Sequence, residues 1–133
     1  MNARRTLATI TATTAALSGL VLLAPAADAS GGTPDVEARG LCTAAATWKL
    51  KAKPDNGRLD IEFEVDSNRV GQAWRVRLTD NGTQIFAGTR TTLAPSGSFA
   101  VHILRANLAG PDTIRARAVN TVNGSVCAGK ITL

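Results

Sequence analysis

Apolar and polar side chains alternate strictly along the segment 46–66, on both sides of a turn at residues 54–57 (PDNG). Such period-two alternation, interrupted by turn residues, is typical of a half-buried antiparallel hairpin. The apolar positions, which we expect to face a core, are Ala46, Trp48, Leu50, Ala52, Leu59, Ile61, Phe63 and Val65. Counting outward from the turn predicts these pairs: Trp48 with Phe63, Leu50 with Ile61, Lys51 with Asp60 and Lys49 with Glu62.

A second hairpin is predicted at Asn81-Gly82, because a two-residue type I′ turn needs positive φ at both positions and Asn-Gly meets this need best. The preceding segment 72–80 alternates in the same way, with arginines on its polar side. The predicted register pairs Leu78 with Ile85, Val76 with Ala87, Trp74 with Thr89 and, on the outer face, Arg77 with Phe86.

A third hairpin is predicted near the end of the chain. The segment 113–120 alternates, Asn123-Gly124 marks a turn, and residues 125–133 return. The predicted register pairs Ala118 with Gly129, Ala116 with Ile131 and Ile114 with Leu133. One more strand, 99–104, lies between the second and third hairpins and is bounded by loops rich in Pro, Gly and Ser.

These segments amount to seven strands, with no amphipathic helix after the N-terminal segment, and predict an all-β fold. Three short turns form hairpins, whereas the longer connections can cross between sheets. The expected architecture is a seven-stranded antiparallel β-sandwich of the immunoglobulin or fibronectin type III kind. One sheet would contain the first, second and fifth strands, and the other would have the order four-three-six-seven.

Two stretches resemble known families. The run Ile114–Asn120 (IRARAVN) resembles the sixth strand of fibronectin type III domains, although Asp112 stands where that family usually has a tyrosine. The segments WKLKAKPDNGRLDIEFEVDSNRVGQAWRVRL and TRTTLAPSGSF, together with a single late cysteine, resemble a group of small exported actinobacterial proteins. That resemblance implies secretion and a single domain, and it supplies no functional residues.

The first 29 residues are predicted to be a secretion signal. Arg4 and Arg5 precede an uncharged stretch rich in Ala, Thr and Leu, and Ala27-Asp28-Ala29 is an A-x-A cleavage site, so we expect cleavage after Ala29. Both the general secretory and the twin-arginine routes stay open. The mature chain of about 104 residues has the size of one domain and no second hydrophobic segment that would span a membrane. We expect residues 30–40 to be a flexible leader and residues 41–133 to form the β-sandwich domain.

Two cysteines remain in the mature chain, Cys42 and Cys127. In an exported protein an even number of cysteines favours a disulfide. In the predicted sandwich both lie at the same pole and face the core, which favours an intramolecular bond. An intermolecular bond or free thiols are the alternatives.

The sequence argues against an enzyme and against a cofactor. A hydrolase needs a nucleophile beside a positioned base, but His102 is the only histidine, and it lies in an apolar strand segment. The carboxylates Asp60, Glu62 and Glu64 share one strand face with lysines opposite, so ion pairing accounts for them. We find no phosphate loop, metal-ligand cluster or dinucleotide fingerprint.

Charge is distributed unevenly between the two expected sheets. Without the signal segment the chain has thirteen basic and nine acidic side chains, a net charge of about +4. Lysines oppose carboxylates on the first sheet, whereas the outer face of the second sheet carries basic side chains and no acidic residue of matching parity. That face is predicted to contain Arg75, Arg77, Arg90, Arg115, Arg117 and Lys130, with Phe86 beside them.

The leading hypothesis is a secreted, non-catalytic module whose arginine-rich face binds an anionic cell-wall or extracellular polymer, without recognising a specific nucleic acid. The alternative for that face is a solvated surface that keeps the protein soluble and blunts edge pairing. A second functional hypothesis is a small-ligand carrier or protein inhibitor that uses the loops at the cysteine pole, residues 66–71, 90–98 and 120–125. The sequence sets no oligomeric state.

Overall fold

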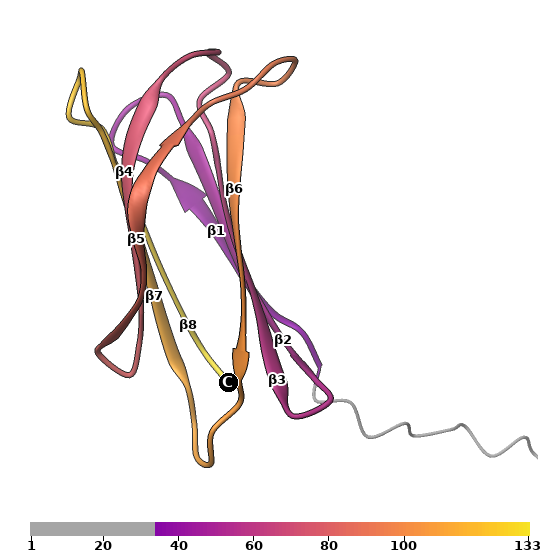
Figure 1. Ribbon diagram of the computed structural model, residues 1–133. Coiled ribbons are helices and arrows are strands. Elements are labelled where there is room, and N and C mark those ends of the chain that lie inside the picture. Colours follow the sequence, from indigo (N-terminus) through magenta and orange to yellow (C-terminus); the bar gives the residue numbers. More distant parts are fainter. Residues whose placement is uncertain (1–33) are drawn as a thin grey trace, which may run out of the picture.

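A computed structural model describes residues 34–133, which fold into two four-stranded antiparallel sheets packed face to face (Figure 1). The strands of the first sheet follow the order β1-β2-β3-β6, and those of the second the order β5-β4-β7-β8. The strand bounds are β1 Val36–Leu41, β2 Thr47–Asp55, β3 Arg58–Asp66, β4 Ala73–Asp80, β5 Thr83–Thr91, β6 Ser98–Ala106, β7 Thr113–Asn120 and β8 Val126–Thr132. The predicted all-β class and the predicted neighbours of the seven strands are confirmed. The predicted secretion signal lies outside the described residues.

The prediction of seven strands is wrong, because part of the expected leader forms an eighth. Val36–Leu41 is strand β1, which pairs antiparallel with β2 along its whole length. Its inward positions are Val36, Ala38 and Gly40, which lie opposite Ala52, Leu50 and Trp48. Two of those three side chains are small, so the apolar half of the alternation was too weak to indicate a strand.

The β2–β3 hairpin has a tighter turn than predicted. Asn56 and Gly57 form a two-residue turn with φ of +48° and +74°, and Asp55 pairs with Arg58. The register is therefore shifted by two residues, so that Leu50 lies opposite Phe63 and not Ile61. The shift preserves which side chains face inward, because the side-chain period of a strand is two.

The β7–β8 hairpin differs in the opposite sense, since its loop is longer than the predicted Asn123-Gly124 turn. Asn120 pairs with Ser125 through a backbone hydrogen bond of 2.8 Å, and residues 121–124 form the loop. The side-chain Oδ1 of Asn120 accepts the backbone N–H groups of Val122 and Asn123, which stabilises the loop. As a result Ala118 lies opposite Cys127 and not Gly129.

In the β4–β5 hairpin the predicted turn is present, but the register changes along the strands. Asn81 and Gly82 have φ of +48° and +83°, the signs that a type I′ turn needs. Beyond the first two pairs, an irregularity between Leu78 and Thr79 shifts the pairing by one residue. Such a β-bulge turns the following side chains of one strand to the opposite face.

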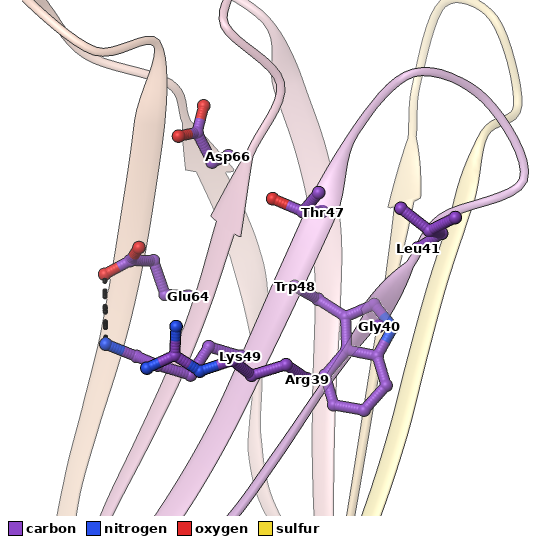
Figure 2. Close-up of a pocket in the computed structure, with 8 residues that line it drawn as sticks. All are labelled: Arg39, Gly40, Leu41, Thr47, Trp48, Lys49, Glu64 and Asp66. Atoms are coloured by element: carbon purple, nitrogen blue, oxygen red, sulfur yellow. Dashed lines mark ion pairs between the residues drawn. The ribbon is translucent and has the colours of Figure 1, made fainter.

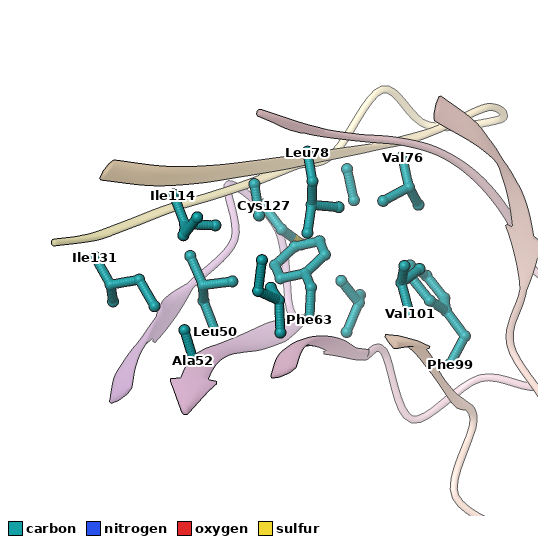
Figure 3. Packing of buried hydrophobic residues seen from close by; sticks show 14 of the residues in the cluster. Leu50, Ala52, Phe63, Val76, Leu78, Phe99, Val101, Ile114, Cys127 and Ile131 are labelled. Atoms are coloured by element: carbon teal, nitrogen blue, oxygen red, sulfur yellow. The ribbon is translucent and has the colours of Figure 1, made fainter. Parts of the chain in front are cut away.

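The core lies between the sheets and is almost entirely apolar. Phe63, Leu50 and Leu78 have no exposed surface, and Figure 3 shows Phe63 among side chains of both sheets. At the β1–β8 side the indole of Trp48 lies against Gly40 and Gly129, where a Cβ atom would come within 2.7 and 2.5 Å of the indole ring. These glycines leave the space that the indole fills.

The predicted disulfide joins Cys42 to Cys127, with a Cα–Cα distance of 4.3 Å. It links the end of β1 to β8, across the two sheets. Four connections gather at this end of the sandwich: residues 42–46, 67–72, 92–97 and 121–125. We call this end the disulfide pole; it is the upper end in Figure 1.

Candidate functional site

Five basic side chains cover the outer surface of the second sheet, and we call this surface the basic face. Its members are Arg75 and Arg77 on β4, Arg115 and Arg117 on β7, and Lys130 on β8, all exposed. The register places Arg77 directly opposite Arg117, and Arg115 directly opposite Lys130. Side chains that are directly opposite in a sheet have Cβ atoms about 4.5–5.5 Å apart. The predicted block of four central arginines is therefore present.

The basic face has no neutralising partners among residues 34–133. None of its five side chains lies within 4 Å of a carboxylate. The outer face of the first sheet is different, because Lys49 Nζ lies 3.3 Å from Glu62 and 3.7 Å from Glu64, and Lys51 Nζ lies 3.0 Å from Asp35. The predicted charge asymmetry between the sheets therefore takes the form of ion pairs on one face and unpaired cations on the other.

Two shallow grooves run over the basic face. One of about 310 Å³ lies between Arg77, Arg115 and Arg117, over the small residues Ala128 and Gly129. The other, of about 540 Å³, is lined by Arg75, Arg77 and Arg117 together with three valines and Gly124. Each groove thus combines guanidinium groups with a low floor of small or aliphatic residues, which allows an extended molecule to approach the arginines closely.

Arg90 and Phe86 do not belong to the basic face, contrary to prediction. Because of the bulge, Phe86 lies opposite Leu78 and Arg90 lies opposite Trp74, both of which face the core. The guanidinium carbon of Arg90 lies 4.7 Å from the centre of the Phe86 ring. This cation–π pair sits on the inner side of edge strand β5. Phe86 therefore packs against the core and offers no stacking surface to a ligand on the basic face.

A buried acidic pair at the end opposite to the disulfide pole was not predicted. Asp80 and Asp112 are 7% and 6% exposed, and Arg105 Nε lies 3.7 Å from Asp80 Oδ2. Burial raises the pKa of Asp80 above its usual value, and the neighbouring charge of Asp112 raises it further, whereas Arg105 lowers it. The sequence did contain a signal, since Asp80 continues the inward parity of Trp74, Val76 and Leu78.

A further opening, of about 530 Å³, lies on the first sheet near the disulfide pole (Figure 2). It is lined by Arg39, Gly40, Leu41, Thr47, Trp48, Lys49, Glu64 and Asp66. Its basic and acidic side chains balance, and the Lys49–Glu64 ion pair crosses it. This mixed lining gives the opening no preference for ligands of either charge.

The comparisons with known proteins return nothing: no family model, no curated protein and no solved structure matches the chain. Within residues 34–133, no helix is long and apolar enough to cross a membrane. The same residues contain no group of three or more His, Cys, Asp or Glu side chains arranged to hold a metal ion.

Proposed function

We propose that this protein is a secreted, non-catalytic binding module and that the basic face holds an anionic polymer of the cell wall or the extracellular space. One observation carries the proposal: Arg77–Arg117 and Arg115–Lys130 are like-charged pairs that lie directly opposite each other, and no carboxylate of residues 34–133 lies within 4 Å of them. Like charges opposite each other destabilise a sheet. A polyanion laid over them would remove this repulsion.

The position of the arginines argues against a purely protective role. Charged residues that prevent edge-to-edge aggregation act on edge strands. Four of the five cations lie on β4 and β7, which are the two central strands of their sheet. If the arginines only kept the protein soluble, mixed charges would serve equally well, such as the lysines and carboxylates on the outer face of the first sheet.

The arrangement favours recognition of repeated charge and not of rings or bases. Alternate residues along a strand are about 6.6 Å apart, so the arginines form a two-dimensional array that matches closely spaced phosphates or carboxylates. Guanidinium groups bind both of these anions with two hydrogen bonds. The described part of the face carries no aromatic side chain on which a base would stack.

The finer fold assignment and family membership belong to the same proposal. The order β5-β4-β7-β8 against β2-β3-β6, with β1 added, supports an immunoglobulin-like or fibronectin type III-like sandwich. The disulfide supports an oxidising, extracellular location. We place the chain among the small exported actinobacterial proteins that it resembles in sequence.

The test is salt-dependent binding to a labelled single-stranded oligothymidylate, used as a simple polyphosphate. We expect the wild-type mature domain to bind with a linear dependence of log K on log salt. Replacing Arg77 and Arg117 with Ala should lower the steepness of that line by about 1.4, because each phosphate contact contributes about 0.7. Fluorescence anisotropy at several salt concentrations measures both quantities.

The matched control is Lys53→Ala with Arg58→Ala, which removes the same charge from exposed positions of the first sheet. It should leave the slope close to that of the wild type. An equal decrease of the slope in both double variants would show that binding depends on the net charge of the domain and not on the basic face. No binding of the wild type at low salt, to this probe or to a polyglutamate of similar length, would overturn the proposal.

A further inference from the structure

A crevice of about 350 Å³ opens at the disulfide pole between three of its loops. Its walls come from the alanines of residues 44–46, from Ser67, Asn68 and Arg69, and from Asn123 and Ser125. Gln72 and Trp74 also line it, at the point where β4 begins. Segments that are far apart in the sequence therefore build one concave site, separate from the basic face.

Among residues 34–133, three buried polar atoms at or next to this crevice have no hydrogen-bond partner. Gln72 Oε1 and Trp74 Nε1 belong to residues that line the crevice, and Asn120 Nδ2 belongs to the residue opposite Trp74 on β7. Trp74 is 1% exposed and lies directly opposite Asn120, which is 2% exposed. Gln72 precedes Trp74 by two residues and shares its inward parity. An unpaired buried polar group costs about 1–3 kcal/mol, so these atoms are expected to be satisfied by a group that enters from outside the chain, either a water or a ligand.

The chemistry of the three atoms is well defined. An indole N–H is only a donor. The amide of Asn120 is oriented by its Oδ1, which accepts the N–H groups of Val122 and Asn123 at 2.9 and 3.1 Å, so its Nδ2 is also a donor. Gln72 Oε1 is an acceptor. The cluster thus offers two donors and one acceptor, all of them uncharged.

The walls of the crevice are held in place before any ligand arrives. The backbone N–H of Thr43 donates to Val126 O at 2.9 Å, beside the disulfide. On the other side, the backbone N–H of Ser67 donates to Gly97 O at 3.1 Å, and that of Gln72 donates to Thr92 Oγ1 at 2.9 Å. A preformed site loses little conformational entropy on binding.

We propose that this crevice binds a small neutral molecule through a hydroxyl or carboxamide group. The oxygen of that group accepts from the Trp74 indole and from Asn120, and its hydrogen is donated to Gln72. A charged group would have to be desolvated without a counter-charge among the three atoms, which costs far more. Gln72 is half-buried and lines the crevice together with Trp74, so its carboxamide is the group that must rotate for a ligand to reach the indole N–H.

The two tryptophans make the proposal directly measurable. Each indole N–H gives one peak in a nitrogen–proton NMR spectrum, and Trp48, which lies between Gly40 and Gly129, is the internal reference. We would titrate acetamide and glucose as neutral probes, and acetate as the charged probe of similar size, to about 100 mM, since such small molecules bind weakly. We expect a saturable shift of the Trp74 peak with a neutral probe, a much smaller shift with acetate, and no shift of the Trp48 peak.

Gln72→Leu should abolish the saturable shift while the domain stays folded, because an apolar side chain of similar shape replaces an unpaired acceptor. Gln84→Leu, at an exposed position of β5, is the matched control and should keep it. An unshifted Trp74 peak with every probe would overturn the proposal. Detection of a long-lived water as the sole contact of the Trp74 indole N–H would also overturn it. An equal shift of the Trp74 peak with acetate and with acetamide would do the same.

Discussion

Single residues determine some of the closest contacts of this domain, and the contact between Trp48 and Gly129 is one of them. Gly129 lies on the inner side of β8, and a Cβ atom there would lie 2.5 Å from Cζ3 of the indole. The half-buried indole packs against the core, so it must shift to relieve a contact this short, and that shift disturbs the packing around it. The packing of the sandwich next to the disulfide therefore depends on the large side chain of Trp48 and on the absence of a side chain at Gly129.

Gly129→Ala is expected to lower the free energy of unfolding by about 1–3 kcal/mol, because it overpacks this contact. Gly88→Ala is the matched control, since its Cβ would lie 3.2 Å from the half-buried ring of Phe86 and should have a smaller effect. Adding Trp48→Phe to Gly129→Ala should cancel part of the loss. Urea denaturation of the wild type, of Gly129→Ala, of Trp48→Phe and of the double variant measures the coupling. Simple additivity of the two single effects would contradict the proposed contact.

The buried carboxyl of Asp80 predicts a pH dependence of stability. Its pKa is raised in the folded protein, first by burial and then by Asp112, so between the unfolded and folded values the folded state binds more protons than the unfolded chain. The contribution to stability is therefore complete below about pH 4 and is lost as the pH rises through the folded pKa.

Asp80→Asn should remove this loss, so that the variant is more stable than the wild type at pH 7 but not at pH 4. Each tenfold difference in proton affinity corresponds to about 1.4 kcal/mol. Thermal unfolding between pH 4 and pH 8 measures the difference, with Asp55→Asn at the exposed β2–β3 turn as the control for loss of one carboxylate. A constant gap between Asp80→Asn and wild type across this range would contradict the assignment.

At the scale of elements, the turns decide how the strands are aligned. Asn81 has a positive φ and also forms two side-chain hydrogen bonds. Its Nδ2 donates to Pro111 O at 3.0 Å, and its Oδ1 accepts the backbone N–H of Thr113 at 2.8 Å. It thereby fastens the β4–β5 turn to the start of β7. Asn56 has the same φ of +48° in the β2–β3 turn, without such side-chain bonds among the described residues.

We therefore expect Asn81→Ala to destabilise the domain more than Asn56→Ala does, by about 1–3 kcal/mol, since two hydrogen bonds are lost in addition to the shared backbone strain. Chemical denaturation of both variants measures the difference. Asn81→Asp, which keeps the acceptor for Thr113, should recover part of it. Equal effects of Asn81→Ala and Asn56→Ala would show that only the turn conformation matters.

The strands and turns also show how much of the fold could be predicted from the sequence. Alternation predicted seven of the strands, and it also predicted the inward sides of β2, β3, β4, β7 and β8, because that pattern depends only on burial. The β7–β8 pairing differs from the prediction by two residues because the length of its loop is set by hydrogen bonds such as those of Asn120. The β2–β3 pairing also differs by two residues, although its Asn56-Gly57 turn is the same type I′ signal that predicted the turn at Asn81-Gly82. The bulge at Leu78 had no signal in the sequence, and it alone removes Arg90 and Phe86 from the predicted site. The positions of the five remaining cations on the basic face could be predicted, because they depend only on side-chain parity and strand order.

For the whole molecule, the disulfide is a covalent link between the sheets in addition to the backbone connections. It joins residues 85 positions apart, and closing a loop of that length in the unfolded chain corresponds to about 4 kcal/mol of stabilisation in the loop-entropy description. Replacing Cys42 and Cys127 together with Ser should lower the free energy of unfolding by about that amount. Urea denaturation measures it, and reduction of the wild type should give a similar loss. A loss well below 1 kcal/mol would show that the noncovalent contacts between β1 and β8 suffice.

The added strand β1 has a practical consequence for any surface that the domain binds. The described chain enters through Asp35 and β1, in the sheet that does not carry the basic face, where Asp35 is tied to Lys51. The last strand, β8, in contrast, carries Lys130 of the basic face itself. A label, tag or tether fused ahead of β1 therefore joins the domain on the sheet opposite to a bound polymer, whereas one fused after Leu133 continues from a strand that belongs to the binding surface.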